Sequence, residues 1–256
     1  MPSIEAVPAF QDNYIWLARA LSEHRCLIVD PGDAVPVVDY LEGTGLSPAA
    51  ILVTHHHADH TGGIEALRRR YEVPVFGPAA EPIPCRDHPV QEGDEVEAAG
   101  LRLRVLEVPG HTLGHVAYAG EGVVFTGDTL FTAGCGRLFE GEPEQMLQSL
   151  KKIAALPDTT WVYCAHEYTL DNLRFAQVVE PDNPAIRARI ARERARRRQG
   201  EPTVPAPLTL ERDTNPFLRT HVPAVREAAQ AHAGRPLTSE AEVFAVLRAW
   251  KDELDA

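Results

Sequence analysis

The segment Thr54-His55-His56-His57-Ala58-Asp59-His60 holds the residues of this chain whose types and spacing are best suited to chemistry. Its pattern His55-x-His57-x-Asp59-His60 places three imidazoles and one carboxylate within six residues. Neutral imidazole and carboxylate groups are the ligands that zinc, iron and manganese accept in proteins. The segment follows a predicted strand, and a tight turn there can aim alternate residues at one point. We therefore expect His55 and His57 to share one metal ion. Asp59 and His60 are expected to face a second ion.

His111, Asp128 and His166 are three further potential ligands, and each comes shortly after a run of residues typical of a strand. Donors that follow several strands indicate a site along one edge of a sheet. Together with the first segment they give seven potential ligands, a number that isolated loop histidines do not explain. We expect the other histidines to pack or to form hydrogen bonds of their own: His24, His56, His88, His115, His221 and His232.

The elements that must position these residues change character along the chain. Apolar and alternating runs predict strands at Arg25–Asp30, Ala50–Thr54, Leu101–Val108, Gly122–Thr126 and Thr160–Cys164. Helices are predicted at Ala34–Glu42, Gly63–Tyr71, Pro143–Leu156, Val222–Ala233 and Glu240–Leu254. Strand patterns stop after about residue 172, and a proline-rich linker is predicted at Pro202–Pro207. We therefore predict an α/β domain over residues 1–172 and a small all-helical domain over residues 173–256.

Charge is spread unevenly over the 256 residues, whose formal net charge is −12. Residues 1–172 carry 11 basic and 25 acidic residues, a balance of −14, and residues 173–256 carry 14 and 12, a balance of +2. An acidic metal-binding part repels phosphate backbones, which argues against nucleic acid as a partner. The seven arginines between Arg187 and Arg198 are expected to form a solvated helix face, because no aromatic residues are interleaved with them.

Neither a membrane span nor an export signal is evident in the sequence, so we expect a cytoplasmic protein without a membrane partner. The four cysteines are dispersed and suit a reducing compartment. A monomer is the expected state.

Several segments taken together resemble the glyoxalase II (hydroxyacylglutathione hydrolase) family of the metallo-β-lactamase superfamily. They are HxHxDH, Phe10-Gln11-Asp12-Asn13-Tyr14, Ala133-Gly134-Cys135-Gly136-Arg137, His166-Glu167-Tyr168-Thr169, Asn215-Pro216-Phe217-Leu218-Arg219 and Leu247-Arg248-Ala249-Trp250-Lys251-Asp252. The resemblance runs nearly end to end. It implies a four-layer αβ/βα sandwich followed by a helical domain. It also implies a thioesterase that converts S-D-lactoylglutathione to glutathione and D-lactate, the second step of methylglyoxal detoxification.

The same resemblance implies two divalent metal ions, with zinc expected first and iron or manganese as alternatives. His55, His57 and His111 would bind one ion, Asp59, His60 and His166 the other, and Asp128 would bridge them. The glutathione part would be bound by Arg137, Tyr168, Arg248 and Lys251. Phe139 stands where some family members have a tyrosine, which is expected to weaken substrate affinity without changing the chemistry.

The expected reaction is attack of a metal-bridging hydroxide on the thioester carbonyl, because two metal ions lower the pKa of a shared water. Asp59 is a metal ligand that could double as a proton acceptor. Asp30 either hydrogen-bonds the far nitrogen of a metal-bound histidine or caps its own turn; the sequence leaves both open. By their charge alone, Arg248 and Lys251 would be solvated surface residues.

Alternative functions remain open at this stage. A persulfide dioxygenase needs only some of the seven ligands and generally lacks the helical domain, and another thioester hydrolase of the superfamily is a second possibility. The −14 balance argues against a metallo-nuclease, and the missing export signal argues against a β-lactamase. A non-catalytic metal- or glutathione-binding protein belongs to a different class altogether. The sequence carries no motif for the acyl group.

Overall fold

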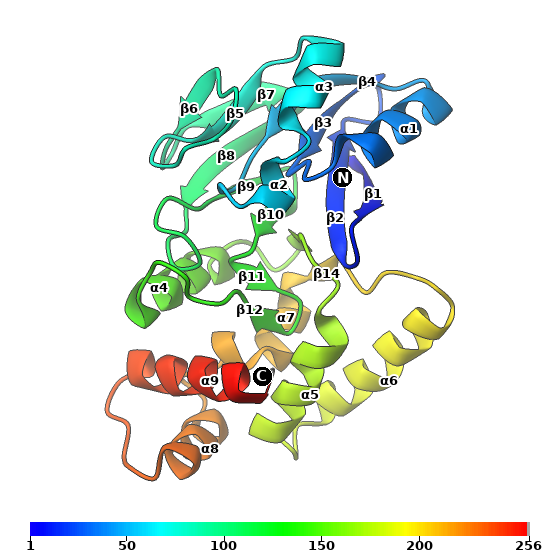
Figure 1. Cartoon of the computed structure of the whole chain (residues 1–256). Coiled ribbons are helices and arrows are strands. Elements are labelled where there is room, and N and C mark those ends of the chain that lie inside the picture. Colours follow the sequence, from blue (N-terminus) through cyan, green and yellow to red (C-terminus); the bar gives the residue numbers. More distant parts are fainter. Residues whose placement is uncertain (255–256) are drawn as a thin grey trace. The chain divides into compact units, whose positions relative to one another are not determined.

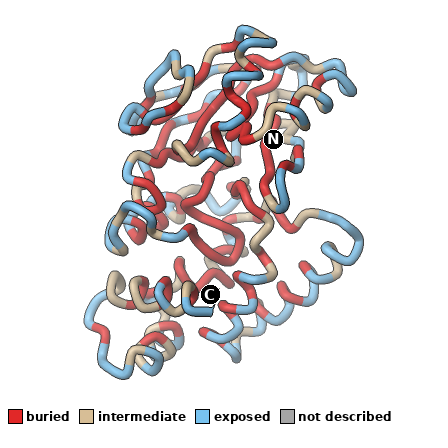
Figure 2. Tube along the Cα trace, in the orientation of Figure 1, coloured by how far each residue is buried: buried red, intermediate tan, exposed pale blue. Residues whose placement is uncertain are grey.

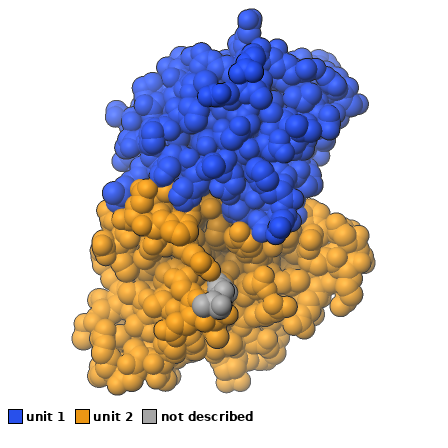
Figure 3. Space-filling view, viewed as in Figure 1, with its two compact units in different colours: residues 1–107, 113–127, 163–166 blue, residues 108–112, 128–162, 167–256 orange. Residues whose placement is uncertain are grey.

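The computed structural model describes residues 1–254, and its contacts divide the chain into two compact units (Figure 3). Unit 1 comprises residues 1–107, 113–127 and 163–166, and unit 2 comprises residues 108–112, 128–162 and 167–256. Each unit is therefore assembled from segments that are far apart in the sequence.

A six-stranded sheet in unit 1 carries the histidine-rich segment (Figure 1). Its strands are β1 (Ser3–Ala9), β2 (Asn13–Arg19), β3 (Arg25–Val29), β4 (Ser47–Leu52), β5 (Val75–Pro78) and β6 (His88–Val90), in that order. β1, β2 and β3 pair antiparallel, and β3 to β6 pair parallel. Helices α1 (Ala34–Thr44) and α3 (Ile64–Tyr71) connect the first parallel pairs and contribute to the same apolar core. Strands β3 and β4 are near-continuous apolar runs because all but their first residues are buried, as Figure 2 shows in red.

A second sheet has the order β14-β13-β10-β9-β8-β7. Its strands are β7 (Glu95–Ala98), β8 (Leu101–Glu107), β9 (Val116–Gly120), β10 (Val123–Gly127), β13 (Trp161–Cys164) and β14 (Ala206–Pro207). In β8 the leucines at 101 and 103 are buried while Arg102 and Arg104 are exposed, which confirms the alternation predicted for this strand. The first two residues of β13 belong to unit 2, where they pair antiparallel with β14.

Helices make up most of unit 2. They are α4 (Pro143–Ala154), α5 (Thr169–Val179), α6 (Pro184–Arg198), α7 (Leu208–Thr214), a 3-10 turn (Pro216–Leu218), α8 (Pro223–Ala233) and α9 (Glu240–Leu254). A short hairpin of β11 (Leu130–Phe131) and β12 (Gly134–Cys135) completes it. α4 begins with a capping box of Glu142 and Gln145 and a proline in its first turn, which explains why its start was readable from the sequence.

The proline-rich stretch is not a linker, and the prediction that strands stop at about residue 172 is wrong. Thr203 and Val204 are each only 1% exposed, and Ala206–Pro207 form β14 at the edge of the second sheet. Proline lacks the N–H that an interior strand needs but is tolerated at a sheet edge, so prolines hid this strand.

The arginine-rich run is not solvated throughout. Arg189 is 1% exposed, and its guanidinium contacts the Glu211 carboxylate at 2.5 Å with both side chains fully buried. The periodicity of α6 places this arginine on the face that also carries the buried Ile186 and Ile190.

All four cysteines are free, and Cys26, Cys135 and Cys164 are buried. Within residues 1–254, none of the helices combines the length and the apolar character that crossing a bilayer demands.

Candidate functional site

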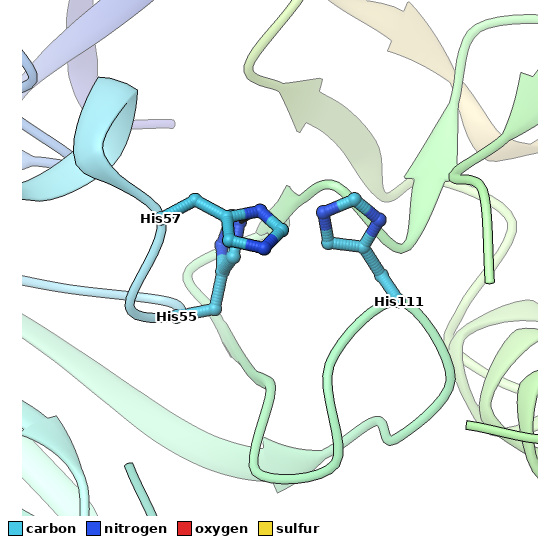
Figure 4. A group of neighbouring side chains, drawn as sticks. All are labelled: His55, His57 and His111. Atoms are coloured by element: carbon cyan, nitrogen blue, oxygen red, sulfur yellow. Dashed lines mark hydrogen bonds between the residues drawn. The ribbon is translucent and has the colours of Figure 1, made fainter. Parts of the chain in front are cut away.

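The histidine-rich segment of unit 1 begins two residues after β4 ends. His55 is fully buried, and its Nδ1 lies 3.0 Å from the Thr54 hydroxyl while its Nε2 lies 3.1 Å from His57 Nδ1. His57 precedes the one-turn helix α2 (Ala58–Thr61), so Asp59 and His60 lie within that turn. Figure 4 draws the rings of His55 and His57 projecting from this segment, and the ring of His111 projecting from the loop after β8.

Asp59, His60 and His166 bring three potential ligand atoms within 4.8 Å of one another inside unit 1. The Asp59 Oδ2 atom lies 3.4 Å from His60 Nε2 and 3.5 Å from His166 Nε2, and it accepts a hydrogen bond from Asn13 Nδ2 at 3.0 Å. Burial raises the pKa of the Asp59 carboxyl, but these hydrogen bonds outweigh burial and hold the pKa well below its usual range. The carboxylate is therefore ionised at neutral pH and is a weak base.

Carboxylates fix the orientation of two of these histidines. His60 Nδ1 lies 3.1 Å from Asp30 Oδ2, and His166 Nδ1 lies 2.8 Å from Asp12 Oδ1. With Nδ1 engaged, each ring turns its Nε2 toward Asp59, which is the orientation that metal-ligating histidines adopt. Asp30 also accepts hydrogen bonds from the Thr54 N–H and hydroxyl, each at 2.7 Å. Of the two roles the sequence left open for Asp30, these contacts match the hydrogen bond to a ligand histidine.

Two of the predicted ligands, His111 and Asp128, lie in unit 2. His111 Nδ1 lies 2.9 Å from the Arg137 carbonyl oxygen, to which it can donate, and His111 Nε2 lies 3.5 Å from Asp128 Oδ2. Both residues are buried. A Cβ on Gly136 would lie 1.9 Å from the Asp128 carbonyl oxygen and 3.1 Å from His111 Nδ1, so only glycine fits beside this pair.

The donor set fits a divalent cation. In His60, His111 and His166, one ring nitrogen faces a protein acceptor and the other faces a carboxylate oxygen, so each ring can offer its Nε2 as a ligand. Imidazole and carboxylate are the preferred ligands of zinc and of other divalent transition metals. The His/Asp groups of this chain therefore form a candidate divalent metal site.

Two histidines outside the predicted ligand set also contact the histidine-rich segment. His56 Nδ1 lies 3.0 Å from a carboxylate oxygen of the buried Glu81, whose other oxygen accepts from the Gly114 N–H. The ring of His115 is fully buried and stacks on His55 with ring centres 4.6 Å apart. His115 therefore packs and His56 forms a hydrogen bond, as expected. Both lie next to the candidate site.

A cavity of about 510 Å³ in unit 2 brings together all five residues predicted to bind substrate. They are Arg137, Phe139, Tyr168, Arg248 and Lys251, and His111 and Asp128 line the same cavity. The predicted substrate residues therefore share one space with two predicted metal ligands.

Arg248 and Lys251 are not solvated surface charges: they are 3% and 5% exposed. Arg248 donates from Nη1 to the Cys135 carbonyl oxygen at 2.8 Å and from Nη2 to Asp252 Oδ1 at 3.0 Å. Its guanidinium also lies 5.1 Å from the centre of the Phe217 ring, a cation–π distance. Its Nε is buried without a hydrogen-bond partner among residues 1–254. Protein groups therefore hold the guanidinium in place at the cavity wall.

The other cavity residues are placed by packing. Phe139 is 63% exposed, and its ring meets His111 edge-on at 5.2 Å, while Tyr168 meets Phe131 edge-on at 5.4 Å. Arg137 Nε lies 3.5 Å from Asp252 Oδ1. Burial raises the pKa of the Cys135 thiol to about 11 although Arg248 opposes the shift, so the thiol stays neutral at physiological pH.

Some residues at the site escaped the sequence analysis as individuals. Asp12 and Asn13 were seen only as part of a motif, and Gly136 only as a neighbour of Arg137. Their roles depend on hydrogen bonds or close approaches between distant segments, and spacing within one segment carries no signal for those.

Comparisons with known proteins agree with this picture. Residues 9–166 match the family model of the metallo-beta-lactamase superfamily, and residues 167–254 match the model described as hydroxyacylglutathione hydrolase C-terminus. The fold resembles crystal structures of ETHE1 from Myxococcus xanthus (TM-score 0.68, 24% identity, 98% of this chain and 91% of that one) and of TTHA1623 in a di-iron-bound form (TM-score 0.58, 27% identity, 85% and 100%). The fold is therefore the metallo-β-lactamase fold, followed by a helical C-terminal region.

The curated relatives narrow the class further. A hydroxyacylglutathione hydrolase of Alkalilimnicola ehrlichii is 56% identical over 255 residues, covering 99% of this chain and 100% of the relative. One of Pseudomonas fluorescens is 54% identical over 254 residues, covering 99% and 100%. The chain belongs to the hydroxyacylglutathione hydrolase family, which confirms the resemblance seen in its motifs. The family models meet at residues 166 and 167, and the units interleave, so the domain boundary at residue 172 stays a prediction.

Proposed function

We propose that this protein hydrolyses S-2-hydroxyacylglutathione thioesters to glutathione and the free 2-hydroxy acid. The first substrate is S-D-lactoylglutathione, which yields D-lactate. The observation that carries the proposal is the cavity of unit 2, where two predicted metal ligands and the buried cations Arg248 and Lys251 line one space. The names of the full-length relatives support the same activity.

The proposal includes two divalent metal ions per chain, zinc in the first instance. His55, His57 and His111 hold one ion, Asp59, His60 and His166 hold the other, and Asp128 bridges them. The orientation of the histidine rings supports ligation, and the di-iron-bound form of TTHA1623 supports a count of two. When bound, such ions lower the pKa of a water and polarise a carbonyl group, which is the chemistry a thioesterase needs.

The residues of this chain supply position and charge. Asp59 acts as a metal ligand, because its Oδ2 lies between His60 Nε2 and His166 Nε2. Arg248 and Lys251, three residues apart on α9, present positive charge to a carboxylate of the glutathione part. The leaving thiol has an ordinary pKa of about 8.5, so it departs as thiolate with little need for a general acid.

Persulfide oxidation is the weaker candidate. The full-length relatives at 54–56% identity are named as hydroxyacylglutathione hydrolases. The cationic cavity and the helical region that supplies Arg248 and Lys251 favour the thioesterase. We propose a monomer that acts in the cytoplasm, and the four free cysteines fit that compartment.

The test is the initial rate of S-D-lactoylglutathione hydrolysis by metal-replete protein, measured before and after chelation. We expect rapid turnover that chelation abolishes and that added zinc restores. Turnover that survives complete removal of metal would refute the metal site, and no turnover by metal-replete protein would refute the substrate. N-acetylcysteine thioesters of the same acid provide the control for a requirement for the glutathione part.

A further inference from the structure

One carboxylate of the unit 2 cavity has no role in the proposed reaction. The cavity is lined by three cationic side chains, Arg137, Arg248 and Lys251, and by two carboxylates, Asp128 and Asp171. Asp128 lies 3.5 Å from His111 and is a proposed metal ligand. Within residues 1–254, Asp171 belongs to none of the residue groups that could hold a metal ion. The role of this negative charge is therefore not explained by the proposed reaction.

Asp171 is on the face of α5 that lines the cavity. Tyr168, Asp171 and Asn172 all line the cavity, and their spacing of three and four residues places them on one face of the helix start. The aspartate is in the first turn, where the helix dipole favours a negative charge. Asp171 therefore lines the same cavity as the cations, at a helix position that favours negative charge.

The present partner of Asp171 is weak and replaceable. Its Oδ1 accepts a hydrogen bond from Arg174 Nη1 at 2.6 Å, and the two side chains are 60% and 71% exposed. Exposed ion pairs of this kind contribute little to stability. Asp171 Oδ2 accepts no hydrogen bond from any residue in the described range 1–254. A second cation can therefore bind this carboxylate without breaking a strong contact.

This inference rests on the proposed function, because it takes a glutathione thioester as the substrate. The charges of the cavity complement those of that thioester. Glutathione carries two carboxylates and a single ammonium group, which belongs to its γ-glutamyl residue. Arg248 and Lys251 match a carboxylate, and Asp171 is the lining carboxylate left to match the ammonium. We propose that Asp171 determines specificity by binding the α-ammonium group of the γ-glutamyl residue, so that the enzyme prefers peptides with a free amine.

The experiment compares S-D-lactoylglutathione with the same thioester acetylated on the γ-glutamyl nitrogen. The wild-type protein is expected to favour the free amine by about two- to fivefold in kcat/KM, through KM, which is the range for one partly exposed charge pair. Asp171→Asn is expected to remove this preference by raising KM for the free amine alone. High salt is expected to shrink the preference in the wild type, because salt screens the pair.

Two further variants sharpen the comparison. Glu144→Gln is the matched control, since Glu144 is also an exposed acid in the first turn of a helix, and it should leave the preference unchanged. Arg174→Gln removes the competing cation and should enlarge the preference. An equal preference in the wild type and Asp171→Asn, or no preference in the wild type, would overturn the inference.

Binding measurements separate this inference from the proposed activity. Calorimetry with S-methylglutathione and its N-acetyl derivative reports the same preference without turnover. If the protein binds S-methylglutathione with the expected preference but hydrolyses no thioester, the activity is wrong and the role of Asp171 stands. If it turns over both thioesters equally in all variants, the activity stands and the role of Asp171 is wrong. Failure to bind S-methylglutathione at all would overturn both.

Discussion

Asp30 in unit 1 and Arg248 in unit 2 are buried charges of opposite sign, and they are satisfied differently. In unit 1 the Asp30 carboxylate is 4% exposed, and protein groups satisfy it: both Thr54 donors and the ring of His60. In unit 2 the Arg248 guanidinium is 3% exposed, and its Nε has no hydrogen-bond partner within residues 1–254. Buried charge is costly unless it is paired. Protein groups therefore satisfy Asp30, whereas Arg248 is paired with Asp252 and keeps one buried N–H without an acceptor within residues 1–254.

The groups that orient the histidine rings also differ between the units. Carboxylates orient His60 and His166, whereas the backbone carbonyl of residue 137 orients His111. A carboxylate raises the basicity of the ring and can be removed by one substitution. A backbone carbonyl cannot be removed by changing a side chain. The rings of His60 and His166 should therefore be more sensitive to mutation than the ring of His111.

The largest effect is expected from Asp59→Ala, which removes the oxygen that both His60 Nε2 and His166 Nε2 approach. Loss of a supporting residue costs 10- to 100-fold in metal affinity or activity, so loss of a ligand should lower kcat by at least about 100-fold. Metal analysis should show about one ion fewer per chain. Glu65→Ala, an exposed acid on α3, is the control. Full metal content with full activity would contradict the assignment of Asp59.

Asp30→Ala should have the next largest effect, because it releases the Nδ1 side of His60. We expect metal affinity to fall about 10- to 100-fold, measured by competition with a chromophoric chelator. Asp33→Ala is a sharp control: Asp33 caps α1 by accepting from the Val35 N–H at 2.9 Å. That variant should lose about 1 kcal/mol of stability and keep its metal affinity. Unchanged metal affinity in Asp30→Ala would show that the carboxylate does not support His60, and would contradict the proposed difference between the units.

Arg248→Ala tests whether the buried guanidinium of unit 2 binds the substrate. Hydrogen bonds to charged groups contribute about 1.5–3 kcal/mol, so KM for the glutathione thioester should rise about tenfold or more. The kcat should change little, because a contact far from the carbonyl contributes equally to the ground and transition states. Arg194→Ala, an exposed arginine of α6, should leave both constants unchanged. A collapse of kcat at constant KM would contradict a role in binding.

The positions of the predicted metal ligands could be placed from the sequence because their signal is local. His55, His57, Asp59 and His60 lie within six residues, and the strands before His111, Asp128 and His166 end close to their predicted positions. Helices with clear start signals, such as α4 and α9, also began where predicted. Local spacing and capping are properties of one segment, and a single sequence displays them directly.

What the sequence could not predict depends on distant partners. The burial of Arg189 depends on Glu211, 22 residues away, and the burial of Arg248 depends on a carbonyl 113 residues away. Charged residues are usually exposed, so charge alone, without knowledge of the partner, favours solvent for both. The edge strand β14 was missed for the same reason, because its strand character comes from pairing with β13 and one of its two residues is a proline.

Arg137→Gln is expected to have the smallest effect, and it isolates the backbone from the side chain at one residue. The side chain is 54% exposed, so KM should rise only about two- to threefold, in the range of an exposed ion pair. Metal content should be unchanged, because His111 contacts the carbonyl of residue 137 and that atom is retained. The measurement is KM together with metal analysis, made in parallel with Asp30→Ala. If Arg137→Gln loses metal as Asp30→Ala does, the guanidinium rather than the carbonyl supports His111, and the units orient their histidines in the same way.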